Sequence, residues 1–94
     1  MSDFGKLMRQ RRESAQIPLN HFAARIGISP AYWSRIERGL EKPPLNPLIE
    51  SAANELGIPL DDAFVAAGRL PPDMQENLAM VVAVFRNRRV ESAA

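Results

Sequence analysis

Apolar side chains recur at helical spacing in successive short segments of this chain, and prolines separate the segments. The pattern predicts five short helices, at about residues 2–14, 19–26, 30–38, 47–56 and 60–67, and a last helix that begins at Pro72. Asn46 is the expected N-cap of the fourth helix. The predicted inward-facing residues of the five helices are Phe4, Leu7, Met8, Phe22, Ala23, Ile26, Trp33, Ile36, Leu48, Ile49, Ala52, Ala53, Leu56 and Phe64. We therefore expect an all-α fold with one small core.

Residues 22–39 have the features of two helices joined by a tight turn. Ala23 provides a small side chain where the helices approach each other, and Gly27 can take the positive φ that ends the first helix. Ser29 then offers an N-cap oxygen, and Pro30 fixes φ at the start of the second helix. These features predict a helix-turn-helix, whose second helix can lie in the major groove of DNA.

Charge is distributed unevenly along the chain, although the formal net charge is only +1. Residues 1–42 hold eight Lys or Arg against four Asp or Glu, a net charge of +4. Residues 43–94 hold four against seven, a net charge of −3. The basic half contains the predicted helix-turn-helix, as attraction to DNA phosphates requires. A solvated surface with uneven charge would give the same counts, so this feature supports a nucleic-acid partner without identifying one.

The composition argues against several other classes of protein. The chain has no Cys, which removes disulfides and thiolate metal sites and suits a reducing, cytoplasmic location. No apolar run is long enough to span a membrane, and the first twelve residues do not resemble a signal peptide. His21 is the only His, and no set of metal ligands, paired carboxylates or phosphate-binding Gly-rich loop accompanies it. We therefore expect no metal, no cofactor and no enzyme activity.

The last predicted helix is amphipathic, and its apolar stripe has no place in a core that five helices already close. The stripe consists of Met74, Leu78, Val81, Val82 and Phe85. It can fold back on its own domain or pair with the same helix of a second chain. Pairing is favoured, because a protein that reads DNA half-sites gains from two-fold symmetry. We therefore expect a DNA-binding domain over residues 1–68 and a dimerisation element over residues 69–94.

The chain resembles the phage-repressor-type helix-turn-helix family, also called the XRE family, over about residues 4–68. The segments that carry the resemblance are FGKLMRQRRESAQI, FAARIGIS, YWSRIERG and KPPLNPLIESAANELGIPLDDAFVAAG. The Ser-x-Ile-Glu-x-Gly pattern at residues 34–39 is a specific ending for the recognition helix of that family. The resemblance implies a five-helix, lambda-repressor-like bundle. It also implies a transcriptional regulator, in the usual case a repressor, that binds a pseudo-palindromic operator in double-stranded DNA as a homodimer.

The resemblance also implies which residues contact DNA. Base contacts are expected from Ala31, Tyr32, Ser34 and Arg35. Arg35 is the strongest candidate, because a guanidinium can bond N7 and O6 of guanine together, and a phosphate contact is its alternative role. Ala31 can offer a methyl contact to thymine. Phosphate contacts are expected from Arg9, Asn20, His21, Arg25, Ser29, Arg38 and Lys42.

Comparison with the family pattern also indicates one structural ion pair and two departures from that pattern. Arg12 and Glu37 match an ion pair that ties the first helix to the recognition helix, and this role is structural. The family often has a Ser or Thr cap followed by Gln where this chain has Pro18 and Leu19, so that phosphate clamp is absent, and Asn20 and His21 are the candidates to replace it. Trp33 stands where the family usually has a medium aliphatic residue. We expect its ring in the core rather than stacked on a base.

An alternative function is open at this point. Small members of this family also act as antitoxins or as regulators paired with a metalloprotease. The tail GRLPPDMQ at residues 68–75 is similar to the metalloprotease-associated variant. In that case the chain still binds DNA, but its last helix holds a partner protein instead of a second copy.

Overall fold

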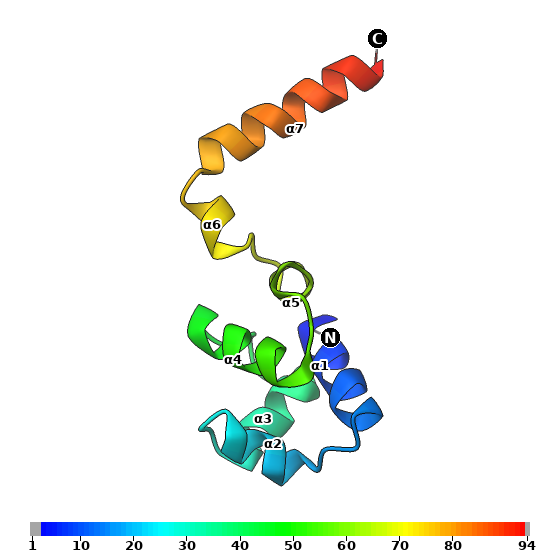
Figure 1. Ribbon diagram of the computed structural model, residues 1–94, viewed down its shortest axis with the longest axis vertical. Helices are drawn as coiled ribbons and strands as arrows, with labels where there is room; N and C mark the ends of the chain where they lie inside the picture. Colours follow the sequence, from blue (N-terminus) through cyan, green and yellow to red (C-terminus); the bar gives the residue numbers. More distant parts are fainter. Residues whose placement is uncertain (1–2, 94) are drawn as a thin grey trace.

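The computed structural model describes residues 3–93, with the side chains of residues 3–87. The described part is helical and contains no strand, which confirms the predicted all-α class. Its helices are α1 (Asp3–Ser14), α2 (Leu19–Arg25), α3 (Pro30–Glu37), α4 (Asn46–Leu56), α5 (Leu60–Ala66), α6 (Pro72–Gln75) and α7 (Leu78–Ala93). Figure 1 shows α1 to α5 gathered in a bundle, from which α6 and α7 lead away.

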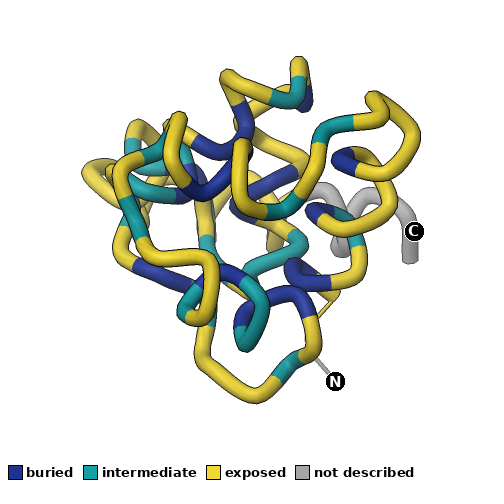
Figure 2. Tube along the Cα trace, turned by 90° about the horizontal axis from the view of Figure 1, so that it is seen from below, coloured by how far each residue is buried: buried dark blue, intermediate teal, exposed yellow. Residues whose placement is uncertain are grey.

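The core of the bundle lies between α1, α2, α3, α4 and α5. Its largest fully buried side chains are Trp33, Phe4, Phe22, Phe64, Met8, Ile36 and Ile49. All seven were predicted to face inward, and each of the five helices contributes buried residues. Figure 2 shows buried and exposed stretches alternating along the chain. Leu7, Ile26 and Leu56 are half-buried and pack against the same core. The core therefore closes without any contribution from α7.

The turn between α2 and α3 has the predicted geometry. Gly27 has a φ of 77°, which ends α2, and Ala23 is fully buried where α2 meets α3. The Ser29 hydroxyl accepts a hydrogen bond from the Tyr32 backbone N–H at 3.2 Å, and Pro30 is the first residue of α3. The helix-turn-helix is therefore fixed by the residues that predicted it.

One close approach between helices was not predicted. Gly5 is buried, and a Cβ added there would clash with the carbonyl oxygen of Ile36 and lie 2.9 Å from that of Glu37. The backbone of α1 therefore contacts the last turn of α3 directly. Only a residue without a side chain allows this contact.

The predicted N-cap of α4 is wrong. Asn46 is the first residue of the helix, and Leu45 occupies the cap position without a side-chain hydrogen bond. The Asn46 Oδ1 atom instead accepts a hydrogen bond from Arg69 Nη1 at 3.2 Å. Arg69 also donates to the carbonyl oxygens of Pro43, at 2.9 Å, and Pro44. These bonds attach Arg69 to the segment that leads into α4.

The last helix is not continuous, contrary to the sequence prediction. The helix that begins at Pro72 ends at Gln75, and α7 begins at Leu78. The Asn77 backbone N–H bonds to the carbonyl oxygen of Met74 at 3.2 Å, which closes a tighter turn at the break. Asn favours helix ends because its side chain competes with the backbone for hydrogen bonds. The predicted stripe is thereby divided, with Met74 on α6 and its other members on α7.

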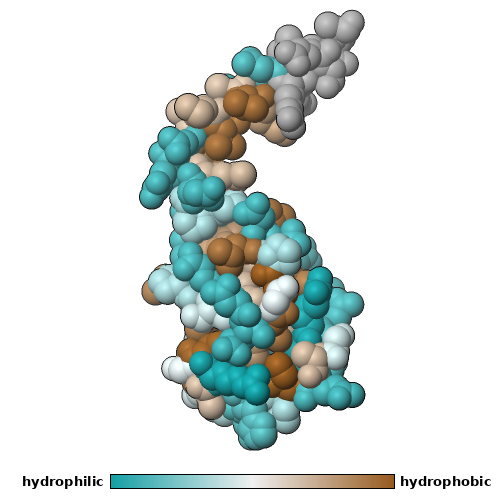
Figure 3. Space-filling model, viewed as in Figure 1, coloured by the Kyte–Doolittle hydropathy of each residue, from teal (hydrophilic) through white to brown (hydrophobic). Residues whose placement is uncertain are grey.

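The helix α7 projects from the bundle and lies at the opposite end of the molecule from α2 and α3 (Figure 1). The principal-axis extents are 51 × 23 × 23 Å, so the projection makes the molecule elongated. Leu78 is 51% exposed and Phe85 is 60% exposed, which shows that this helix does not fold back on the core. Met80 and Val84, outside the predicted stripe, are also exposed. Figure 3 shows apolar side chains gathered on this projecting segment.

Candidate nucleic-acid interface

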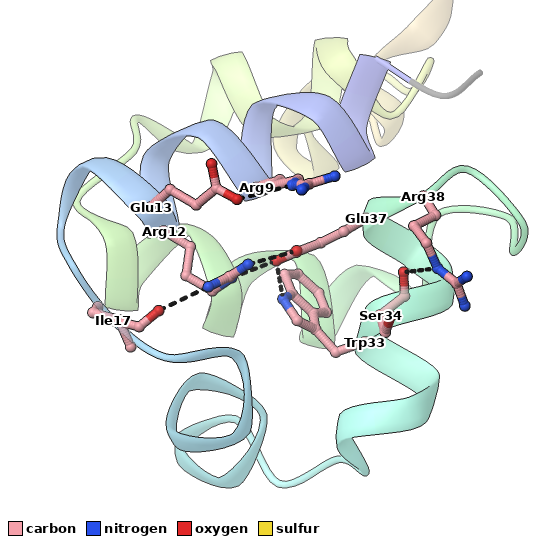
Figure 4. A network of polar contacts seen from close by, with 8 residues as sticks. All are labelled: Arg9, Arg12, Glu13, Ile17, Trp33, Ser34, Glu37 and Arg38. Carbon is pink, nitrogen blue, oxygen red and sulfur yellow. Dashed lines mark hydrogen bonds and ion pairs between the residues drawn. The ribbon is translucent and has the colours of Figure 1, made fainter.

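The helix α3 has a buried side and an outer side, as its 3.6-residue period requires. Trp33, Ile36 and Glu37 are buried. The four predicted base-contacting residues lie elsewhere on the helix surface: Ala31 is exposed, and Tyr32, Ser34 and Arg35 are half-buried. Figure 4 shows Ser34 and Arg38 on the side of α3 turned away from the buried network. The predicted reading residues are therefore accessible on one helix.

The predicted phosphate-contacting residues are all exposed: Arg9, Asn20, His21, Arg25, Ser29, Arg38 and Lys42. Asn20 and His21 lie in the first turn of α2, and Arg25 ends that helix. Ser29 and Arg38 are the residues on either side of α3. Polar and basic groups thus surround α3 at the end of the molecule formed by α2 and α3.

Three of the candidate arginines are paired with carboxylates of the same chain. Arg9 Nε lies 2.9 Å from Glu13, Arg25 lies 3.9 Å from Glu55, and Arg35 Nε lies 3.2 Å from Glu41. The hydrogen bond between Arg9 and Glu13 raises the pKa of Arg9 and lowers the pKa of Glu13. Sequence reasoning missed these pairs, although the i, i+4 spacing of Arg9 and Glu13 is a recognised signal.

The ion pair expected from the resemblance is present and nearly inaccessible to solvent. Arg12 Nε donates to Glu37 Oε2 at 2.7 Å, and Arg12 Nη2 donates to Glu37 Oε1 at 2.9 Å (Figure 4). The Arg12 side chain is 10% exposed and that of Glu37 is 3% exposed. Arg12 Nη1 also donates to the carbonyl oxygen of Ile17 at 2.8 Å. The network therefore joins α1, α3 and the segment that leads into α2.

The buried charges of Arg12 and Glu37 neutralise each other, and their polar atoms have hydrogen-bond partners. The hydrogen bond to Glu37 raises the pKa of Arg12 above its ordinary value, since the buried carboxylate stabilises the guanidinium charge. No buried side-chain nitrogen or oxygen within the described residues lacks a hydrogen-bond partner. A bidentate bond between planar groups fixes orientation as well as distance. The arrangement therefore holds α3 at a set angle to α1, and it does not turn Glu37 toward the surface.

Trp33 belongs to the core and also to this network. Its ring meets Phe4 edge-to-face, with centroids 6.4 Å apart, and lies 5.0 Å from the ring of Phe22. Its indole Nε1–H donates to Glu37 Oε2 at 2.6 Å. We predicted the burial of Trp33 but not this hydrogen bond, which the i, i+4 spacing of Trp33 and Glu37 permits. The Trp ring thus supplies a third donor to a buried carboxylate.

An open hollow of about 640 Å³ lies between α1 and the end of α3. Its lining consists of Lys6, Arg9, Gln10, Glu13, Ser14, Glu37 and Arg38. Two of its cations, Arg9 and Arg38, are predicted phosphate contacts. Within residues 3–93, no group of three or more His, Asp or Glu side chains is arranged to hold a metal ion. Nor does that part of the chain contain a helix with the length and apolar character needed to cross a bilayer.

Comparison with known proteins gives matches in sequence over most of the chain. A model of the helix-turn-helix domain family matches residues 3–64. An uncharacterised HTH-type transcriptional regulator of Mycobacterium tuberculosis is 37% identical over 68 residues, which cover 72% of this chain and 48% of that protein. The uncharacterised HTH-type transcriptional regulator RghRB of Bacillus subtilis is 33% identical over 79 residues, which cover 81% of this chain and 57% of that protein. The chain spans about half the length of the curated relatives it matches.

Solved structures of regulators share the fold. The clp gene regulator ClgR of Corynebacterium glutamicum gives a TM-score of 0.63 at 25% identity, over 95% of this chain and 86% of that chain. The master regulator for biofilm formation SinR, solved in complex with DNA, gives a TM-score of 0.57 at 26% identity. That second match covers 61% of this chain and 90% of SinR.

Proposed function

Because the chain belongs to the helix-turn-helix domain family, we propose that it is a sequence-specific regulator of transcription that places α3 in the major groove of double-stranded DNA. The observation that carries this proposal is the outer side of α3, where the reading residues are accessible and exposed basic groups flank them. The relatives are named as transcriptional regulators rather than enzymes, and SinR was solved with DNA. The proposed function requires no cofactor.

In this proposal Arg35 is the main source of base discrimination. Its guanidinium bonds N7 and O6 of guanine, a contact that other base pairs cannot reproduce. Ala31 meets a thymine methyl group, and Tyr32 and Ser34 bond base edges or phosphates. The exposed residues Arg9, Asn20, His21, Arg25, Ser29, Arg38 and Lys42 contact phosphates and position the protein on the duplex.

The active form in this proposal is a homodimer that represses transcription in the cytoplasm from a pseudo-palindromic operator. The exposed residues Leu78, Val82 and Phe85 of α7, with the half-buried Val81, support it, because such an apolar surface marks an interaction site. An open, apolar hollow of about 330 Å³ lies beside them, lined by Met74, Met80, Val81, Val84 and Phe85. A second copy of α7 would cover this surface.

The same surface also supports the alternative, in which α7 holds a toxin or a metalloprotease instead of a second copy. Light scattering of the purified chain separates the two possibilities. A dimer without any other protein supports the homodimer. A monomer that retains the bundle fold supports a regulator with a separate protein partner.

The test of sequence-specific DNA binding compares two arginines, Arg35 within α3 and Arg38 directly after it. The full chain first selects its preferred duplex from a pool of random DNA sequences. Its affinities for this selected duplex and for a scrambled duplex are then measured. Arg35→Ala is expected to cost about 1–3 kcal/mol on the selected duplex and to relax preference at one base pair. Arg38→Ala is expected to weaken binding to both duplexes alike. If Arg35→Ala lowers both affinities by the same factor, Arg35 contacts only phosphate.

A further inference from the structure

The side chain of Arg35 is held on two sides within its own chain. Its Nε–H donates to Glu41 Oε1 at 3.2 Å, and its guanidinium carbon lies 6.0 Å from the centre of the Tyr32 ring. The Arg35 and Glu41 side chains are 43% and 41% exposed, so both remain accessible to a DNA duplex. Glu41 is thus an acidic group bonded directly to the main proposed base-reading residue.

The backbone after α3 places Glu41 there. Gly39 has a φ of 76°, its N–H bonds to the carbonyl oxygen of Ile36 at 3.1 Å, and the Leu40 N–H bonds to that of Arg35 at 2.9 Å. This pair of bonds is the Schellman motif, which turns the chain back over the last turn of a helix. The residue that follows Leu40 is therefore brought beside Arg35 by the helix cap itself, and not by the flexibility of a long side chain.

The geometry of the bond leaves the reading end of Arg35 available. A guanidinium carries five N–H groups in a planar fork, and Glu41 accepts the one on Nε. The two terminal nitrogens, Nη1 and Nη2, can then donate together to N7 and O6 of guanine. A planar group that is bonded at Nε has lost much of its freedom to rotate, so less entropy is lost when the base is bound.

We propose that Glu41 is a positioning residue for base recognition, which orients Arg35 by accepting its Nε–H and presents its terminal nitrogens to guanine. This inference rests on the proposed function. The Glu41 charge also repels phosphate, so Glu41 lowers affinity for DNA in general while it sharpens the preference at one base pair. Glu41 therefore weakens binding to every duplex but increases the preference for one base pair. A simpler, rival account predicts only the weakened binding. In the rival account, Glu41 only competes with DNA for Arg35.

The experiment uses the full chain, the selected duplex, and a second duplex that differs only at the base pair where Arg35→Ala loses discrimination. The measured quantity is the ratio of the two dissociation constants. Glu41→Ala is expected to reduce this ratio about two-fold to five-fold, the range of an exposed ion pair, and to raise affinity for a scrambled duplex. Glu41→Gln, whose amide oxygen still accepts the Nε–H, is expected to reduce the ratio less than Glu41→Ala does. Melting temperatures of both variants should match the parent, since Glu41 is exposed.

Glu13→Gln is the matched control, because Glu13 is also an exposed carboxylate paired with a candidate DNA-contacting arginine, Arg9 at 2.9 Å. Glu13→Gln removes a charge that repels phosphate but does not alter a contact of any base-reading residue. Affinity for every duplex should therefore rise, and the ratio of the two dissociation constants should be unchanged. In an Arg35→Ala background, Glu41→Ala should leave the ratio unchanged as well.

The inference is overturned if Glu41→Ala leaves the ratio unchanged or raises it, while the parent chain still prefers its selected duplex. It is also overturned if Glu41→Ala lowers the ratio equally with and without Arg35. If the parent chain does not distinguish the selected duplex from the scrambled one, the proposed function itself is wrong. That result is visible before any Glu41 variant is measured.

Discussion

The bundle formed by α1 to α5 and the helix α7 are both rich in apolar residues, yet they expose them very differently. In the bundle, apolar side chains recur at helical spacing, and Phe4, Phe22, Trp33 and Phe64 are fully buried. In α7, residues 78–85 are all apolar, and Leu78, Met80, Val84 and Phe85 are more than half exposed. Apolar residues are therefore buried where helices pack together in the bundle, and they stay exposed on the helix that projects from it.

The two regions also differ in how polar groups are used. The bundle buries a carboxylate and satisfies it with three donors from Arg12 and Trp33. In α6, by contrast, the side-chain amide of Gln75 donates to the backbone carbonyl oxygen of Leu70, and this hydrogen bond is exposed to solvent. The buried polar network thus lies within the bundle, whereas the apolar side chains of α7 remain exposed.

Arg12→Ala should have the largest effect on the bundle. It removes both Arg12 donors from Glu37, whose side chain is 3% exposed, and leaves a buried charge without its counter-ion. The expected loss is about 3–5 kcal/mol of unfolding free energy, measured by chemical denaturation. Arg11→Ala, at the exposed neighbouring position, should stay within about 0.5 kcal/mol of the parent. Equal losses in the two variants would mean that the pair does not stabilise the bundle.

Trp33→Phe isolates the hydrogen bond from the ring. Phe retains an aromatic side chain against Phe4 and Phe22 but cannot donate to Glu37. We expect a loss of about 1.5–3 kcal/mol, because the lost bond is to a charged group. Circular dichroism is the appropriate readout, since Trp33 is the only tryptophan and its fluorescence disappears. An unchanged stability would show that Arg12 alone satisfies Glu37.

Val81→Glu combined with Phe85→Glu tests the other region. The bundle should keep its unfolding free energy within about 0.5 kcal/mol, because both residues lie on the projecting helix. The mass from light scattering should fall from dimer to monomer, and binding to the operator should weaken to single half-sites. Asn87→Glu, a polar substitution on the same helix, should leave the dimer intact. If the double variant unfolds, α7 belongs to the core, and if it remains dimeric, the interface lies elsewhere.

The smallest expected effect concerns the exposed pair of Arg9 and Glu13. Arg9 holds the pKa of Glu13 below its ordinary value of 4.5. A carboxylate with a lowered pKa in the folded state contributes stability above that ordinary value, and the contribution is lost as the pH falls through the folded pKa. Melting curves of the parent and Glu13→Gln should therefore differ slightly at neutral pH and converge in acid. A difference that grows in acid would contradict this assignment.

Local features of the sequence predicted most of the fold. The helical spacing of apolar residues gave the five helices of the bundle, and Gly27, Ser29 and Pro30 gave the turn, because each acts within a few residues of itself. Asn46 was misassigned as a cap because its partner, Arg69, is distant in sequence. The close approach at Gly5 was missed for the same reason, since it depends on where α3 ends in space.

The candidate site was predictable to a smaller extent. Resemblance to a family indicated Arg12 and Glu37, and the structure contains their ion pair. It gave no indication of the bond between Arg35 and Glu41, because that contact depends on the backbone turn at Gly39. In the proposed function, base preference depends on how the side chains of α3 are oriented. No sequence pattern encodes that orientation on its own.

The central claim, that α3 and the surrounding cations read DNA, is tested most directly by the salt dependence of specific binding. Affinities of the full chain for its selected duplex and for a scrambled duplex are measured over a series of salt concentrations. We predict that log K falls linearly with log salt, with a slope of about −0.9 for each phosphate contacted, and that the selected duplex remains preferred throughout. A flat response, or equal affinity for the two duplexes at every salt concentration, would contradict the claim.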